Sequence, residues 1–417
     1  MGRDHSIELS NLIKAPVENL KSLYDIFRGN VGVMAISWLL FSLTGSFINP
    51  YFAKYAKDLG ATDYDVALMR SLGMLALALS LIPGGLLTDY IGRVRVILIG
   101  TALVSVSQFL FGLAPDWRFL TAVYIFDNAA HFYQPALTAI IMDSLRKGEE
   151  FKGFIGLSII TSTPNLFMPI AGGFLYDTVG VMGIRIGFYV QGLIAIVVLF
   201  LRVKALRETF NPHNRELSKF ILEIAGYRGV LIKAVKIYLF TSVLWQVATS
   251  VSATYLALFV LDYLGLSKPS WGLLVAVSTL GNMIASLYLI NRKLNLESIA
   301  YKSALIVSLS TALIALTSHL NNAYLIIILL GVISLVSSVF SNILGSSISA
   351  VLTRILPPEV RGRAIGMQRL LDNLGASMSA QIAALLYIKV GYAESFIVSG
   401  IIGAASSMYL KRILIRK

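Results

Sequence analysis

The sequence predicts an all-α integral membrane protein with twelve transmembrane helices and both termini in the cytoplasm. Three observations predict this fold: the composition, the length of the charge-free runs and the position of the basic residues. Hydrophobic residues make up 56% of the 417 residues and charged residues 14%, whereas soluble proteins carry about 25% charged residues. The composition therefore excludes a soluble enzyme and a soluble nucleic-acid-binding protein.

Each expected span is a run of about 20 mostly apolar residues, which is the length that crosses the hydrocarbon core of a bilayer. The spans of the first half are residues 31–53, 71–88, 96–115, 119–142, 153–176 and 186–201. The spans of the second half are residues 237–261, 269–291, two spans within 303–353 that separate at 318–322, and residues 373–388 and 395–410.

The basic residues indicate how these spans are oriented. Of the 35 Lys and Arg residues, most fall on the side of the two termini. The other side has only Lys54, Lys57, Arg70, Arg118, Arg185, Lys268 and Lys389. Since Lys and Arg are retained in cytoplasmic loops, both termini are expected in the cytoplasm of a multi-pass protein of the cytoplasmic membrane. The net charge of +13 then reflects topology, and no nucleic-acid partner is expected.

The chain is expected to divide into two halves joined by a linker. Residues 1–30 form a cytoplasmic amphipathic segment, 31–204 the first bundle, 205–236 a linker with a short interfacial helix at 216–224, 237–410 the second bundle and 411–417 a cytoplasmic tail. Similar short sequences recur about 210 residues apart, at 150–153 and 359–362 and at 179–180 and 390–391. This repeat indicates that the halves are duplicates, as in many transporters.

Charged side chains inside a span are costly, so each one is a candidate for function. Asp127 lies about 12 Å into the fourth span, and His131 follows one helical turn later. Such a pair can share a proton, which suits proton coupling. The alternative is a polar contact between helices without a role in transport.

A second pair stands in the eleventh span, where Arg369 and Asp372 are three residues apart. It is a further candidate for proton coupling or gating, or else a structural ion pair near the inner interface. Arg70 is expected to reach the membrane surface from the second span. The chain has no Cys and only four His, so neither a metal site nor a resident cofactor is expected.

Residues 85–95, Gly-Leu-Leu-Thr-Asp-Tyr-Ile-Gly-Arg-Val-Arg, resemble the signature loop of the major facilitator superfamily of transporters. Tyr90 and Val94 depart from its usual basic residues. The resemblance implies two six-helix bundles around a central cavity. It also implies that the loop glycines permit a tight turn, that its acid faces a helix N-terminus, and that these charges help to hold one conformation. The residues concerned are Gly85, Asp89, Gly92, Arg93, Arg95 and, at the end of the fourth span, Asp143.

The fifth span is similar to a helix-packing pattern of exporters in that superfamily. Pro169, Gly172 and Gly173 stand in the expected register, although Met168 replaces a glycine. A proline and small residues make a helix that can kink and pack closely. This pattern favours export.

The same resemblance implies that the first, fourth, seventh and tenth helices line the cavity. The candidates for solute contact, including one on the fifth helix, are Asn49, Asn128, Gln134, Asn165, Trp245, Gln246 and Asn342. Hydrogen bonds that only pack helices are the alternative role for polar residues in spans.

The resemblance implies a secondary active transporter that moves a small organic solute by alternating access. The proton gradient is its expected energy source, and a monomer is the expected working unit. We expect proton-coupled export of partly hydrophobic compounds. The alternatives are proton-coupled or facilitative uptake of a sugar-like or other polar nutrient, and a membrane sensor that does not transport. The lipid bilayer and the solute are the expected partners.

Overall fold

The computed structural model describes residues 27–146, 150–209, 228–290, 295–356 and 358–415. Within these ranges the chain is helical, with short connections and no β-strand. The expected interfacial helix at 216–224 and almost all of segment 1–30 lie outside them. The helix at Arg228–Leu239 begins within 205–236, the expected linker.

The helices before residue 210 form a first group. Its members are α2 (Gly29–Ile48), η1 (Asn49–Tyr51), α3 (Phe52–Asp58), α4 (Asp63–Ile91), α5 (Arg93–Leu113), α6 (Trp117–Ala130), η2 (His131–Tyr133), α7 (Gln134–Ser144), α8 (Glu150–Ser162), η3 (Thr163–Leu166), α9 (Met168–Val179) and α10 (Val181–Ala205).

The helices after residue 227 form a second group. Its members are α12 (Arg228–Leu239), η4 (Phe240–Leu244), α13 (Trp245–Leu258), η5 (Phe259–Tyr263), α14 (Lys268–Ile290), α15 (Leu296–Leu313), η6 (Ile314–His319), α16 (Ala323–Ile355), α17 (Pro358–Leu385), η7 (Leu386–Val390) and α18 (Glu394–Ile415).

Ten helices of the described chain are long and apolar enough to cross a membrane, so the protein is a multi-pass membrane protein. Two expected spans, 119–142 and 373–388, are not among the ten. The first is divided into α6 and α7 by the 3₁₀ turn η2, and neither part alone reaches a bilayer's thickness. The second belongs to α17, whose N-terminal part is rich in charged residues.

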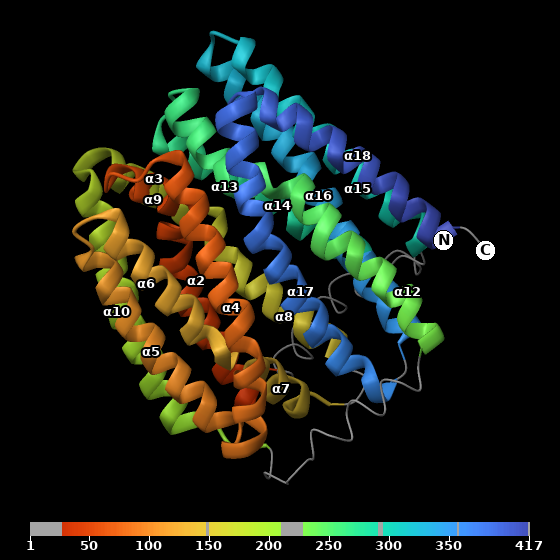
Figure 1. Ribbon diagram of the computed structural model, residues 1–417. Coiled ribbons are helices and arrows are strands. Elements are labelled where there is room, and N and C mark those ends of the chain that lie inside the picture. The colour runs from red at the N-terminus through yellow and green to blue at the C-terminus, as the bar shows by residue number, and fades with distance from the viewer. Residues whose placement is uncertain (1–26, 147–149, 210–227, 291–294, 357, 416–417) are drawn as a thin grey trace, which may run out of the picture.

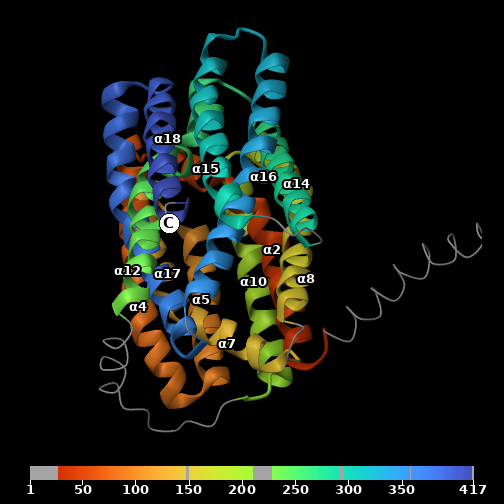
Figure 2. The ribbon, with the colours of Figure 1, turned by 90° about the vertical axis from the view of Figure 1, so that its right-hand side faces the viewer.

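Each group packs mainly on itself. In the first group α10 lies against α5 and α2, and α4 lies against α6. In the second group α15 lies against α16 and α18, and α14 against α16. The groups meet where α4 contacts α17 and where α9 contacts α14. Figures 1 and 2 show the helices of both groups running alongside one another.

The apolar cores distinguish the two ends of the molecule. At the end that carries the loops 59–62, 114–116 and 264–267, one core contains buried residues of both groups, among them Tyr51, Tyr55, Tyr255 and Phe259. We call this the joined end. At the opposite end, which carries Gly92 and the chain from 206 to 209, each group has a core of its own. We call this the divided end, and Figure 1 shows the groups spreading apart toward it.

Candidate functional site

A cavity of about 1050 Å³ lies between the two groups. The first group supplies most of its lining, and the second group contributes the stretch Ser252–Ala257 of α13 without its Tyr255, together with Trp271 and Arg369. Its volume matches that of a site for a small organic molecule. The charged or titratable side chains in its lining are Arg70, Tyr124, Asp127, His131, Tyr133, Arg202 and Arg369.

Asp127 lies at the C-terminal part of α6 and faces this cavity. Its Oδ1 accepts hydrogen bonds from the Ser107 hydroxyl and, at 3.1 Å, from Nε2 of Gln108, both on α5. Its side chain is 15% exposed and that of His131 is 31% exposed. The carboxylate is therefore largely desolvated, but three polar side chains surround it.

The structure brings His131 to Asp127, as the sequence predicts, although not on one continuous helix. Helix α6 ends at Ala130 and His131 opens the turn η2. Nδ1 of His131 lies 2.6 Å from the Asp127 carbonyl oxygen and 3.6 Å from its Oδ2. Because a carbonyl oxygen only accepts hydrogen bonds, Nδ1 carries a proton, and Nε2 is left to bind or release one.

Arg202 is a cavity residue that the sequence does not reveal. The sequence counts Arg202 among the basic residues on the side of the termini; in the structure α10 continues to Ala205 and buries Arg202 to 1% exposure. Its Nη1 donates to the Thr101 hydroxyl at 2.5 Å and its Nε to Ser37 at 3.3 Å. The guanidinium is thus held between α10, α5 and α2 by neutral groups.

Two further arginines line the cavity. Nη1 of Arg70 donates to the Ala253 carbonyl of α13 at 3.0 Å, so Arg70 bridges the groups instead of reaching the membrane surface as expected. Arg369 lines the cavity from α17 with an exposed side chain. The expected pair of Arg369 with Asp372 does not form: Asp372 accepts from Ser242 at 2.5 Å, and no ion pair joins it to Arg369.

The other candidates for solute contact divide into two sets. Four of them line the cavity: Asn49, Asn128, Gln134 and Asn165. Three do not: Trp245, Gln246 and Asn342.

The positions of these last three have local causes. Trp245 packs against Phe240, with ring centroids 5.6 Å apart. Gln246 packs against Gly375 of α17, and Asn342 donates to Ser286 of α14 at 3.3 Å. Each side chain is therefore used inside the second group.

Sequence reasoning missed the polar side chains of α5 and α10. Ser107 and Gln108 contact Asp127, and Gln191 lies in the cavity lining. In the sequence, each of these three polar residues interrupts an otherwise apolar run, and this pattern could have indicated them.

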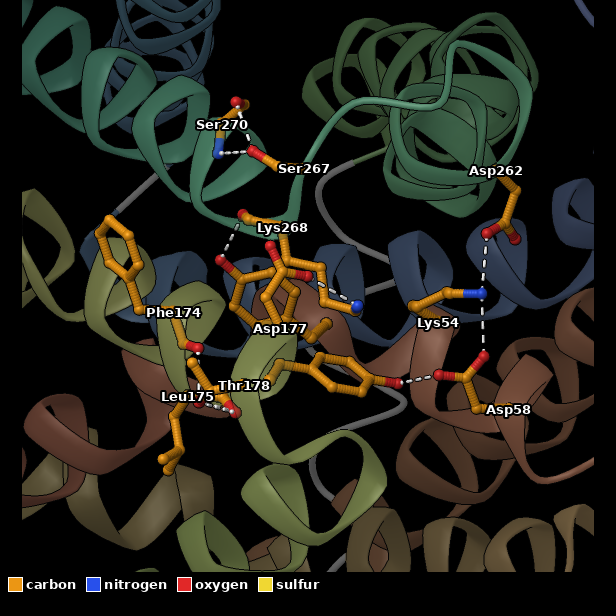
Figure 3. Close-up of polar contacts among 12 residues, drawn as sticks. Lys54, Asp58, Phe174, Leu175, Asp177, Thr178, Asp262, Ser267, Lys268 and Ser270 are labelled. Atoms are coloured by element: carbon orange, nitrogen blue, oxygen red, sulfur yellow. Dashed lines mark hydrogen bonds and ion pairs between the residues drawn. The ribbon is translucent and has the colours of Figure 1, made fainter.

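Polar contacts cross between the groups at the joined end (Figure 3). Lys54 of α3 lies 2.8 Å from Asp58 on its own helix and 2.8 Å from Asp262 of the second group. Lys268 of the second group lies 2.8 Å from Asp177 of α9. The Tyr176 hydroxyl donates to Asp58 at 2.6 Å, which orients that carboxylate.

Close backbone packing supports the same contacts. The Tyr51 hydroxyl is 2.6 Å from the Pro169 carbonyl and 3.0 Å from the Lys268 carbonyl. A methyl group at Gly173 would lie 2.6 Å from the backbone of Lys268, and one at Gly172 would collide with the Phe47 carbonyl. The Pro169, Gly172 and Gly173 motif therefore lies where α9 packs against α2 and α14.

Four described polar contacts at the divided end lie within the first group. Arg93 forms an ion pair with Asp143 and donates to the Ala139 carbonyl at 3.0 Å and the Thr209 hydroxyl at 3.1 Å. Glu208 Oε2 accepts from the Val94 amide at 2.9 Å. We call Arg93, Asp143, Glu208 and Thr209 the Arg93 cluster.

The signature loop differs from the expectation in two respects. Gly85 lies inside α4, and only Gly92, with φ of 89°, makes the turn. The acid that faces the N-terminus of α5 is Glu208, whereas Asp89 is exposed, as is Arg95. Glu208 was not recognised because it is distant in sequence, beyond the sixth span.

A helical membrane protein with a cavity between two groups of helices, closed at one end, has the architecture of a transporter. The comparison of the sequence with protein families agrees with this class. Residues 34–344 match the Major Facilitator Superfamily. The chain belongs to this superfamily.

Two relatives and one solved structure show the range of similarity. The chain is 28% identical over 155 residues to the quinolone resistance protein NorA of Staphylococcus aureus, covering 37% of this chain and 39% of NorA. It is 25% identical over 402 residues to the uncharacterized MFS-type transporter MJ1560 of Methanocaldococcus jannaschii, covering 92% and 98%. The match to NorA thus spans less than half of that relative's length.

The crystal structure of a D-xylose-proton symporter is similar in fold, with a TM-score of 0.72 and 14% identity, covering 91% of this chain and 96% of that one. At this identity the similarity concerns the fold alone.

Proposed function

We propose that this protein is a proton-coupled secondary active transporter of the cytoplasmic membrane that moves a small organic solute by alternating access. We further propose twelve spans in two six-helix bundles, 31–204 and 237–410, with both termini in the cytoplasm and the monomer as the working unit. In this arrangement α6 with α7, and α17 with η7, are the two spans beyond the ten apolar helices.

The observation that carries the proposal is the position of Asp127. It is the one carboxylate in the described cavity lining, and His131, Ser107 and Gln108 contact it. A carboxylate that can be reached from the cavity and has hydrogen-bonding neighbours can take up a proton on one side of the membrane and release it on the other. Intramembrane acids of this kind form proton relays in transporters.

The divided end faces the cytoplasm in this proposal. The support is that the few Lys and Arg residues expected outside, such as Lys54, Arg118 and Lys268, belong to the joined end. The structure then represents a state in which the outer side is closed. Transport requires the joined end to separate while the divided end closes.

Two directions of transport each have a specific support. Export is supported by the similarity to NorA, whose name describes quinolone resistance, and by the closely packed Pro169 and Gly173 region. Uptake of a polar nutrient is supported by the polar side chains of Asn49, Asn128 and Gln134 in the cavity lining, which can form hydrogen bonds with such a solute.

Transport by purified protein in proteoliposomes, after a pH jump, tests the coupling. The substrates are a panel of dyes, sugars and organic acids, and the variants are Asp127→Asn and the matched control Glu297→Gln, an exposed residue of α15. We expect a proton gradient to drive transport in the wild type and the control. In Asp127→Asn the gradient-driven part should fall at least about tenfold, as for loss of a general acid-base group.

The direction of solute movement relative to the proton gradient distinguishes export from uptake. Gradient-driven transport that persists unchanged in Asp127→Asn would overturn the proposed coupling site. Transport that never responds to the gradient would overturn proton coupling itself.

A further inference from the structure

We infer that the solute carries an anionic group and that Arg369, Arg70 and Arg202 select it. This inference rests on the proposed function, because it takes the cavity as the solute site. It concerns the substrate class, which neither the fold nor the family determines.

The formal charge of the cavity lining is the first observation. Three arginines and a single carboxylate, Asp127, line the same cavity. The lining therefore carries two net positive charges when Asp127 is ionised and three when it is protonated. Charges in a low-dielectric interior are costly unless they are paired. An anionic solute supplies the missing charge.

The partners of the arginines are the second observation. Arg202 contacts the hydroxyls of Ser37, Thr101 and Tyr133 and the Phe41 ring. Arg70 contacts a carbonyl. In the described part of the chain, no carboxylate forms an ion pair with Arg70, Arg202 or Arg369. The lysines of the joined end differ, since Lys54 and Lys268 each have an acidic partner.

The exposure of the three guanidinium groups assigns them different roles. Arg202 is 1% exposed and fixed by its hydroxyl partners, so it acts through its electric field. Arg369 is exposed within the cavity lining and can offer its planar donors to a carboxylate in a bidentate contact. Arg70 has further donors beside the one bonded to Ala253.

The arginines also lie on both sides of the cavity. Arg369 belongs to the second group, whereas Arg70 and Arg202 belong to the first. Like charges on the two groups repel each other across the cavity, and an anion between them replaces repulsion with attraction. Anion binding is therefore expected to favour closure of the two groups around the solute.

Protonation of Asp127 is expected to strengthen anion binding. The titratable groups near Asp127 are His131, which contacts it, and Tyr124 and Tyr133, with Arg70 beside Tyr124 and Arg202 beside Tyr133. A proton on Asp127 or on His131 adds one positive charge to the cavity. Lower pH thus favours the anion, and a bound anion favours the proton. An anion would therefore cross the membrane in the same direction as the proton. A cation, whose binding the proton weakens, would cross in the opposite direction.

Binding to the full-length protein in lipid nanodiscs tests the inference. The probes are benzoate, hexanoate and glucuronate, each with its primary amide and its ammonium counterpart. The shift of the thermal unfolding midpoint with probe concentration gives the affinity. Carboxylates stay ionised at both about pH 8 and about pH 6, so a change in affinity reports on the protein.

We expect at least one anion to bind about tenfold or more tightly than its amide, because contacts to charged groups are of this strength. Its affinity should increase from about pH 8 to about pH 6, and the combined variant Asp127→Asn with His131→Gln should lose this increase. Arg369→Gln should weaken anion binding about tenfold and amide binding clearly less. Arg369→Lys should retain part of the preference. Arg118→Gln, outside the cavity lining, is the matched control and should bind like the wild type.

Anions that bind no tighter than their amides on all three skeletons, or that do not bind at all, would overturn the inference. So would an Arg369→Gln variant that weakens anion and amide equally. Asp127-dependent transport of a neutral or cationic solute would leave the proposed function intact and remove the anion inference. Anion binding without any gradient-driven transport would leave the anion inference intact and overturn the proposed function.

Discussion

The two ends of the molecule use charge in different ways. At the joined end, Lys54 and Lys268 form ion pairs that cross between the groups (Figure 3). At the divided end, the described contacts of Arg93 stay within the first group. Among the described residues, the contacts that hold the two groups together are thus concentrated at one end, as the proposed alternating access requires of one state.

The strength of these contacts is compatible with repeated opening. The ion pairs are partly exposed, and such pairs contribute roughly 0–1 kcal/mol each. The shared apolar core adds to them, and in the proposed mechanism its surfaces separate while the divided end closes. The apolar core that both groups share therefore stabilises the joined end more than its ion pairs do.

The largest effect is expected from locking the joined end. The hydroxyls of Ser71 in α4 and Ser377 in α17 are 3.2 Å apart, across the two groups. Since the chain has no cysteine, Ser71→Cys with Ser377→Cys allows a single defined disulfide. Oxidation should reduce transport at least about tenfold, because the outer side can no longer open, and reduction should restore it.

The matched control lies at the divided end within the first group. Asn30 Nδ2 is 3.1 Å from the Ser144 hydroxyl. The cross-link between Asn30→Cys and Ser144→Cys should leave transport close to that of its reduced form. Equal inhibition by both cross-links would remove the distinction between the two ends.

A smaller effect is expected from preventing close packing at the joined end. Gly173→Val places a branched side chain against the backbone of Lys268 and Pro269. Overpacking of this kind costs about 1–3 kcal/mol, so the population should shift toward a state with the joined end open. Labelling of a cysteine introduced at Ala257, a cavity residue, by a membrane-impermeant reagent from outside should accelerate. Gly265→Val is the control for backbone strain without interhelical contact. A Cβ atom at Gly265 would have no atom within 4 Å, but the φ of Gly265 is 65°. This variant should leave the labelling rate unchanged.

The smallest effect is expected from single ion pairs. Lys54→Met and Asp262→Asn each remove the pair that crosses between the groups. A double-mutant cycle on the thermal unfolding free energy should give a coupling of up to about 1 kcal/mol that decreases with salt. A coupling several times larger, or one insensitive to salt, would show that electrostatics dominates the joined end.

The spans were predictable from sequence because a bilayer imposes length and apolarity on each helix. The break at His131 was not, since residues 119–142 form one run in the sequence, whereas Tyr133 of the turn η2 packs in the core of the first group. The length of α17 was missed because its charged N-terminal part resembles a loop.

The site was predictable in part for a similar reason. A carboxylate within an apolar run stands out, so Asp127 was found. Arg202 stands at the end of such a run, where a buried and a solvated position look alike, and its partners Ser37 and Thr101 are distant in sequence. Trp245 and Asn342 were assigned to the cavity from the helix they belong to, but the direction of each side chain depends on neighbours that the sequence does not specify.

Distances between spin labels at both ends test directly whether the joined end and the divided end exchange their contacts. Tyr64→Cys with Tyr263→Cys reports on the joined end, and Tyr90→Cys with Arg354→Cys on the divided end; all four positions are exposed. Both distances are measured in nanodiscs, in the native background and with Gly173→Val. Gly173→Val should lengthen the first distance and shorten the second. Distances that stay fixed, or that change in the same sense, would contradict the exchange of contacts between the two ends.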